Sequence, residues 1–267
     1  MKIYLLGSPE VVFDRQPISF PTQKALALLI YLAVEGGMHG RDRLMTLLWP
    51  EREAEKANVT LRTTLSRLRK SLIPAGEFLI SQGGKVGFDF SKSSDIDLAR
   101  LAASAQPEIA PDELRIILTL DRGEFLEGFT LPDAPDFDTW AATRREACQR
   151  QLETVYDRLS QHLLAIHDSA GAVETAARWV ARAPLSEQAY RRLMAAQALS
   201  GQRPAALQTY RQLQATLQQE LDLKPGRETA LLADNIGRGR VEEERADPSA
   251  VGSSGPAGEA EQRLTLP

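Results

Sequence analysis

The sequence predicts a mainly α-helical protein with a small β component: an N-terminal winged helix-turn-helix followed by an all-α domain of helical repeats. Two observations support this fold class. In the first 94 residues, short β-prone segments are followed by three helical patterns and then by a hairpin signal. From residue 95 the pattern is almost wholly helical, and it repeats at a shift of 34 residues.

The first 20 residues predict a meander of short strands. Residues 2–6, 10–13 and 18–20 are β-prone, and the segments between them hold turn formers such as Gly7 and Asp14. We therefore expect the chain to begin with a small sheet.

Two helices are predicted next. Thr22 can cap the first helix, whose apolar residues recur at spacings of three and four until Gly36 stops it. The second helix is expected over residues 41–49, where Pro50 ends it because proline cannot donate the backbone hydrogen bond that a helix interior needs.

A third helix and a hairpin complete the predicted winged helix. Over residues 53–72, leucines fall on one stripe at spacings of four, three and four, so that stripe needs a core partner. The β-prone segments 78–81 and 85–90 flank Gly83 and Gly84, which is a hairpin signal.

The second half of the chain repeats itself. In tetratricopeptide repeats, small residues let two helices approach each other and bulky residues fill the groove between them. The positions that match at a spacing of 34 are Ala172-Val173 with Ala206-Leu207, Ala176 with Tyr210, Trp179 with Leu213, Tyr156 with Tyr190, and Leu159 with Leu193. We therefore predict tetratricopeptide-like helical repeats; a plain helical bundle with chance matches is the alternative.

These patterns divide the chain into three parts. Residues 1–94 are the predicted winged helix and residues 95–236 the predicted helical domain. Residues 237–267 hold charge, Gly, Ser and Pro but few large apolar groups, so burial cannot offset their ordering entropy. We expect a disordered linker or tail there, and a linker suggests that the sequence is the front part of a longer polypeptide.

The charge is distributed unevenly between the two halves. Residues 1–94 hold 13 Lys and Arg against 9 Asp and Glu, a net charge of +4, whereas the remainder holds 19 against 27, a net charge of -8. This asymmetry favours contact of the first part alone with a polyanion.

Cysteine content and hydropathy indicate a cytoplasmic protein. Cys148 is the single cysteine, which excludes an internal disulfide and fits a reducing compartment. No apolar run reaches the roughly 18 residues that a membrane-spanning helix needs, so we expect no contact with a membrane.

The predicted third helix has a basic face that carries hydroxyl groups. Its residues 58–72 hold four basic side chains and no acidic one. Arg and Lys neutralise DNA phosphates or bind guanine, while Thr and Ser contact base edges. The side chains that point away from the leucine stripe or flank it are Thr60, Arg62, Thr63, Ser66, Arg67 and Lys70. A solvated face of an ordinary amphipathic helix is the alternative, but the hairpin that follows favours a winged helix on DNA.

Several stretches resemble the SARP-type transcriptional activators, a family named for antibiotic regulation. Residues 44–72, LMTLLWPEREAEKANVTLRTTLSRLRKSL, are similar to the OmpR-type winged helix of that family. In the family, this winged helix is followed by a bacterial transcriptional activator domain. Four segments of this chain resemble that domain: RGEFLEGF (122–129), PDFDTW (135–140), APLSEQAYRRLMAA (183–196) and AALQTYRQLQATLQQELDLKPGRET (205–229). The resemblance covers about residues 1–236.

The resemblance implies a sequence-specific regulator of transcription. Such a protein binds promoter DNA, often as two molecules side by side on direct repeats, and recruits RNA polymerase as an activator. With the third helix in the major groove, the base-reading candidates are Arg62, Thr63, Ser66 and Arg67. The phosphate-binding candidates are Thr22, Lys24, Arg69, Lys70 and Lys85. Because Arg69 lies close to the leucine stripe, a structural role is its alternative.

The resemblance also assigns a role to the loop between the second and third helices. In the family this loop faces RNA polymerase, which here indicates Trp49, Glu51 and Arg52. For Trp49, a place in the hydrophobic core is the alternative.

We expect no catalytic residue, metal or cofactor. The histidines, His39, His162 and His167, fall in no metal-binding or catalytic-triad motif. Gly83-Gly84-Lys85 lacks the earlier glycine and the following Ser or Thr of a nucleotide-binding phosphate loop. The main alternative to a DNA-binding regulator is a repeat-based adaptor whose N-terminal domain binds protein.

Overall fold

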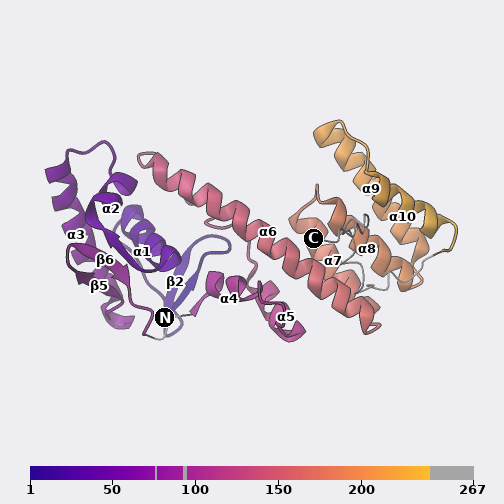
Figure 1. The fold of residues 1–267 in the computed structure, drawn as a ribbon, viewed down its shortest axis with the longest axis horizontal. Coiled ribbons are helices and arrows are strands. Elements are labelled where there is room, and N and C mark those ends of the chain that lie inside the picture. The colour runs from indigo at the N-terminus through magenta and orange to yellow at the C-terminus, as the bar shows by residue number, and fades with distance from the viewer. Residues whose placement is uncertain (76, 93–94, 241–267) are drawn as a thin grey trace, which may run out of the picture.

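The computed structural model describes residues 1–75, 77–92 and 95–240, and the predicted linker lies outside the described residues from residue 241 onward. The molecule is elongated, with the winged helix at one end and the helical repeats at the other (Figure 1). The long helix α6 (Pro135–Ala165) runs between them. The predicted fold class, mainly α with a small β component, is therefore confirmed.

A four-stranded sheet contains both the first strand of the chain and one from beyond residue 94. Its order is β3–β2–β1–β7, with β7 parallel to β1 and the other neighbours antiparallel. The strands are β1 (Lys2–Tyr4), β2 (Glu10–Phe13), β3 (Gln16–Pro17) and β7 (Asp95–Ile96).

The predicted strand over residues 18–20 is wrong. Asp14 and Arg15 both have positive φ angles, 49° and 63°, and form a two-residue turn between β2 and β3. This turn pairs Phe13 directly with Gln16, so the strand pairing begins earlier in the chain than the hydropathy pattern indicated.

Three helices follow at the predicted positions: α1 (Gln23–Glu35), α2 (Arg41–Leu48) and α3 (Ala54–Leu72). The Thr22 hydroxyl accepts a hydrogen bond from the Ala25 N–H at 3.2 Å, which confirms the predicted cap. Gly36 ends α1 with a φ of 64°, a backbone conformation that glycine adopts without strain.

A second sheet forms the wing, with strand order β4–β6–β5. The hairpin of β5 (Leu79–Gln82) and β6 (Lys85–Phe88) turns at Gly83 and Gly84, whose φ angles of 57° and 77° suit a tight two-residue turn. Strand β4 (Met38–Gly40) was not predicted, because it is three residues long and finds its partner only when β6 packs beside it.

The remaining described helices are α4 (Asp97–Ala103), α5 (Pro111–Leu120), α7 (Ser169–Arg182), α8 (Glu187–Leu199), α9 (Arg203–Leu221) and α10 (Arg227–Gly237). Successive helices from α6 to α9 pack on one another, as the predicted repeats require. Ala172 and Ala206 are fully buried where the helices approach, and Trp179 and Leu213 fill the space beside them. The predicted helical repeats are thus confirmed.

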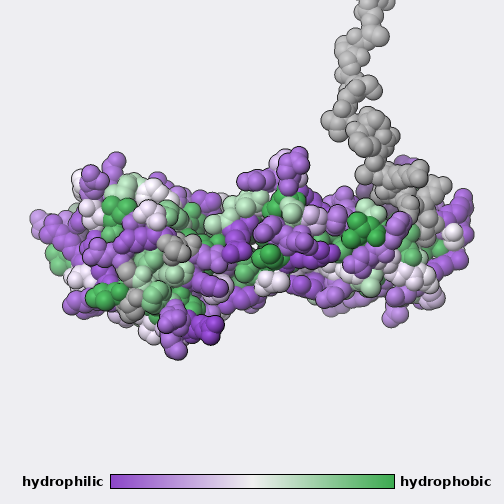
Figure 2. Space-filling view, turned by 90° about the horizontal axis from the view of Figure 1, so that it is seen from below, coloured by the Kyte–Doolittle hydropathy of each residue, from purple (hydrophilic) through white to green (hydrophobic). Residues whose placement is uncertain are grey.

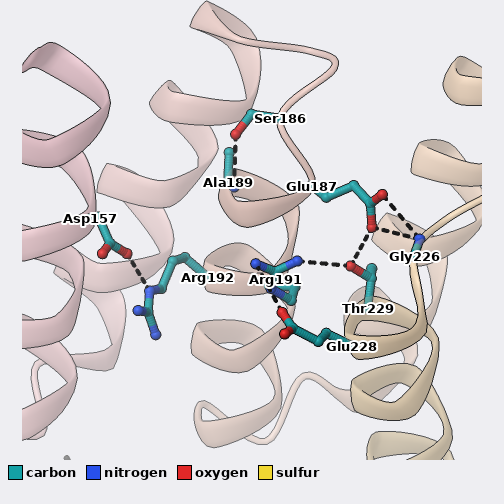
Figure 3. A network of polar contacts seen from close by, with 9 residues as sticks. All are labelled: Asp157, Ser186, Glu187, Ala189, Arg191, Arg192, Gly226, Glu228 and Thr229. Atoms are coloured by element: carbon teal, nitrogen blue, oxygen red, sulfur yellow. Dashed lines mark hydrogen bonds and ion pairs between the residues drawn. The ribbon is translucent and has the colours of Figure 1, made fainter. Parts of the chain in front are cut away.

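A polar network joins α10, the last helix of the described residues, to the repeats (Figure 3). The Glu187 carboxylate accepts hydrogen bonds from the Gly226 N–H and from the Thr229 hydroxyl. Arg191 donates to the same hydroxyl at 3.2 Å and lies 3.5 Å from Glu228. These contacts hold the N-terminus of α10 against α8.

The winged helix and the helical domain share one hydrophobic core. The buried Asp97 at the start of α4 accepts the N–H groups of Leu5 and Leu6 at 2.6 and 2.8 Å. Burial raises the pKa of this carboxyl above its ordinary value, because its effect exceeds that of the hydrogen bonds, which lower the pKa. The peptide that follows β1 is therefore held by a residue from beyond the predicted boundary at residue 94.

On the face shown in Figure 2, hydrophilic residues cover most of the surface and hydrophobic ones form small separate patches. None of the helices in the described part of the chain is both long and apolar enough to cross a membrane.

Candidate nucleic-acid interface

The basic face of α3 is open to solvent. Opposite it, the buried side chains that pack into the core are Ala57, Leu61, Thr64, Leu65, Leu68 and Leu72. The base-reading candidates, Arg62, Thr63, Ser66 and Arg67, are all exposed. Within the described residues, no hydrogen bond or ion pair engages the side chains of Arg62, Arg67 and Lys70. The structure therefore leaves these cations available to an external partner.

The order of residues along α3 explains how this face is presented. Glu55 lies in the first turn, while Arg69 and Lys70 lie in the last turn, so each charge suits the helix dipole at its end. The hydroxyls of Thr60 and Thr63 donate to the carbonyls four residues earlier, at 2.8 and 3.0 Å. This orientation leaves the lone pairs of both oxygens free to accept hydrogen bonds, and Arg52 donates one to the Thr60 oxygen.

A hollow runs beside this face, between α3, the start of α1 and the loop that joins α2 to α3. It brings together the predicted phosphate residues Thr22 and Lys24 and the predicted base-reading residues Thr63 and Arg67. The other residues that line it are Pro21, Ala25, Trp49, Arg52, Val59, Thr60 and Thr64. Apolar, hydroxyl and cationic groups thus meet at one edge of α3.

Among the phosphate candidates, Lys24 already has a partner. Its ammonium lies 2.7 Å from Oδ2 of Asp133 and 5.6 Å from the centre of the Trp49 ring. Asp133 was missed by the sequence analysis, because it belongs to the segment before α6 and nothing in the local pattern places that segment beside α1.

The candidates on the wing side are of two kinds. Arg69 donates to the Ser81 hydroxyl at 2.5 Å and so links α3 to β5. This contact matches the structural role that the sequence analysis gave as the alternative for Arg69. Lys70 and Lys85 are exposed, and Lys85 starts β6 directly after the glycine turn. Within the described chain, no hydrogen bond or ion pair engages the Lys85 ammonium.

The loop between α2 and α3 is partly buried. Trp49 is 5% exposed and forms a wall of the hollow, as its alternative core role predicted. Glu51 and Arg52 are exposed, and Arg52 donates to the Thr60 hydroxyl at 3.1 Å. The exposed residues of this loop therefore include Glu51 and Arg52.

Val59 is a further residue of this surface that the sequence analysis missed. Its side chain is 63% exposed and lines the hollow one turn before Thr63. A β-branched residue is a poor helix former, and exposing its apolar side chain to water does not stabilise the fold. The signal in the sequence was an apolar residue that does not fall on the leucine stripe.

The described residues include no group of three or more His, Cys, Asp or Glu side chains that could hold a metal ion. Cys148 is buried, and this burial raises the pKa of its thiol to about 11, which keeps it protonated at neutral pH.

Comparison with known sequences gives three matches. Residues 89–236 match the family described as the bacterial transcriptional activator domain. The chain is 31% identical over 238 residues to the regulatory protein AfsR of Streptomyces griseus, a match that covers 86% of this chain and 23% of AfsR. It is 23% identical over 218 residues to the transcriptional regulatory protein MoaR1 of Mycobacterium tuberculosis, covering 78% of this chain and 70% of MoaR1. The chain thus spans less than a quarter of the length of AfsR.

Among solved structures, the chain is similar to Mycobacterium tuberculosis EmbR in complex with a low affinity phosphopeptide. The TM-score is 0.69 at 24% sequence identity, over 89% of this chain and 65% of the EmbR chain. At this identity the likeness shows a shared fold.

Proposed function

We propose that this chain, which belongs to the SARP-type family of transcriptional regulators that carry the bacterial transcriptional activator domain, binds promoter DNA in a sequence-specific way. The observation that carries the proposal is the open face of α3, where Arg62 and Arg67 stand without partners among the described residues. The relatives named above are regulatory proteins, which favours this function over catalysis.

On duplex DNA, α3 lies in the major groove. Arg62, Thr63, Ser66 and Arg67 contact base edges there, since guanidinium and hydroxyl groups can pair with the exposed donors and acceptors of the bases. Lys70, Lys85 and the cap residue Thr22 contact backbone phosphates, with Lys85 reaching them from the wing. Arg69 stabilises the wing and reaches phosphate through its remaining N–H groups.

The regulator acts as an activator that recruits RNA polymerase in the cytoplasm, with two molecules side by side on direct repeats. Family membership supports this part of the proposal. Glu51 and Arg52 contact the polymerase from the loop between α2 and α3, while Trp49 supports that loop from beneath.

The test is the salt dependence of binding to duplex DNA. Duplexes are first selected from a random library with the purified chain, and binding is then followed by fluorescence anisotropy at several salt concentrations. Contact with about six phosphates predicts a slope of log affinity against log salt of about -5. Arg62→Ala combined with Arg67→Ala should abolish the selection of a common sequence. Arg211→Ala combined with Arg227→Ala removes the same charge from the exposed surface of the repeats and should bind normally.

A protein-binding adaptor is the second candidate function. It is favoured by the groove between α6 and α8, which is lined by Arg150, Glu153, Thr154, Asp157 and Gln188. An adaptor would show no affinity for duplex DNA even in dilute buffer, so the same titration separates the two functions.

A further inference from the structure

Asp133 brings a negative charge from the helical domain to the hollow beside α3. The turn that carries it is held in place: the Ala134 N–H donates to the Leu131 carbonyl at 2.8 Å, and the Leu131 N–H donates to the Asp138 carboxylate at 2.9 Å. Both Leu131 and Ala134 are buried. The backbone of Asp133 is therefore held in place, and its carboxylate lies 2.7 Å from the Lys24 ammonium.

The two partners differ in exposure. The Lys24 side chain is 16% exposed, whereas the Asp133 side chain is 71% exposed. The lysine is thus covered by Trp49 and by the carboxylate, while the carboxylate faces solvent. Ion pairs with one partner in water are weak and exchange readily, so another anion can replace Asp133.

The surroundings favour an anion at this position. The hydrogen bond from Lys24 lowers the pKa of Asp133, and the charge of Arg52 lowers it further, so the carboxylate is ionised at neutral pH. Thr63 and Arg67 of α3 line the same hollow as Lys24. A DNA strand that follows α3 would bring its phosphates, which are also anions, to this lysine.

We propose that Asp133 competes with a backbone phosphate of DNA for Lys24, and that the helical domain thereby limits the affinity of the winged helix for duplex DNA. The inference rests on the proposed DNA binding. In the free chain the carboxylate neutralises Lys24; in the complex a phosphate oxygen takes its place, and Asp133 turns to the solvent that already surrounds it. Asp133 also repels the incoming strand until this exchange occurs.

The experiment compares four full-length proteins, wild type, Asp133→Asn, Lys24→Gln and the double variant, on one selected duplex over a range of salt. Asp133→Asn should bind about fivefold more tightly at about 0.1 M salt, because the phosphate no longer has to displace a carboxylate from Lys24. Its slope of log affinity against log salt should stay close to that of wild type, because Lys24 contacts a phosphate in both complexes. Lys24→Gln should bind more weakly with a shallower slope. In the Lys24→Gln background, Asp133→Asn should change the affinity little, because its effect acts through the lysine.

Asp136→Asn is the matched control. Asp136 is exposed in the first turn of α6, and no hydrogen bond or ion pair engages its side chain within the described residues. Its replacement removes the same charge and should leave the affinity close to that of wild type. Thermal unfolding of each variant checks the fold, and Asp133→Ser provides a second neutral variant with the same expected gain.

Three results would overturn the inference: no gain in Asp133→Asn and Asp133→Ser, an equal gain in the Lys24→Gln background, or an equal gain in Asp136→Asn. A wild-type chain that binds no duplex overturns the proposed function together with this inference. If the wild-type chain binds duplex DNA and Asp133→Asn binds it with the same affinity, only the inference is overturned.

Discussion

At the scale of single residues, the exposed face of α3 holds side chains that contribute little to helix stability. Val59, Thr60 and Thr63 are β-branched, and such residues lower helix propensity because they lose side-chain freedom. An isolated surface helix gains stability from acidic partners four residues before its cations. The glutamates of this segment, Glu51, Glu53 and Glu55, stand instead before α3 or in its first turn, away from Arg62 and Arg67.

Arg67→Ala tests this face directly. Because Arg67 is exposed and lines the hollow, its loss should leave thermal stability almost unchanged. It should cost about 1–3 kcal/mol of DNA binding and relax the preference at one base position. Repeating the sequence selection with the variant measures the preference, and anisotropy measures the affinity. An unchanged footprint with full affinity would remove Arg67 from the interface, and Arg211→Ala serves as the control for charge.

At the scale of elements, the end of α1 is tied to α6 by one carboxylate. Glu35 accepts hydrogen bonds from the Trp140 indole at 2.7 Å and from the Arg144 guanidinium. Burial raises the pKa of Glu35, but the hydrogen bonds from Trp140 and Arg144 together with the charges of Arg144 and Arg43 outweigh it, and the pKa falls below its ordinary value of 4.5. This contact sets how the winged helix is held against the long helix.

The lowered pKa of Glu35 predicts a pH-dependent contribution to stability. A carboxyl group whose pKa is lower in the folded state stabilises the fold above its unfolded pKa, and this contribution is lost as the pH falls through the folded pKa. Glu35→Gln should therefore lower the free energy of unfolding by about 1 kcal/mol at pH 7, a modest value because Arg144 is partly exposed. The difference from wild type should shrink as the pH drops below 4.5. Urea unfolding of both proteins at several pH values measures it, and a difference independent of pH would contradict this assignment.

At the scale of the whole molecule, the two modules act as one body. Strand β7 joins the N-terminal sheet, Asp97 binds the peptide after β1, and the core is continuous from α1 to the repeats. Helix α3 lies at the far end of the molecule from α9 and α10 (Figure 1). The helical domain thus packs against the winged helix, and Asp133 reaches Lys24 at the start of α1.

Truncation of the chain tests this dependence. A fragment of residues 1–94 keeps α1, α2, α3 and the wing but loses β7 and Asp97. We expect the amide protons of Leu5 and Leu6 to exchange much faster in this fragment than in residues 1–240, because their hydrogen-bond acceptor is absent. The amides in the middle of α3 should lose less protection. Equal protection of Leu5 and Leu6 in the two proteins would show that the winged helix does not depend on Asp97.

Local patterns were sufficient for much of this architecture. The leucine spacing predicted α3 and its outward face, the Thr22 cap and Gly36 predicted α1, and the 34-residue period predicted the packing of the repeats. Each of these signals lies within one helix, one turn or one repeat, where neighbouring residues fix the backbone conformation through hydrogen bonding and side-chain periodicity.

The contacts that join distant parts of the chain could be found only in the folded molecule. Asp97 binds Leu5 across 92 residues, Asp133 pairs with Lys24, and β4 and β7 exist because another strand lies beside them. These pairs form when buried apolar surfaces pack and bring polar groups together as a consequence. Because that packing depends on the summed shape of many side chains, no short stretch of sequence contains it.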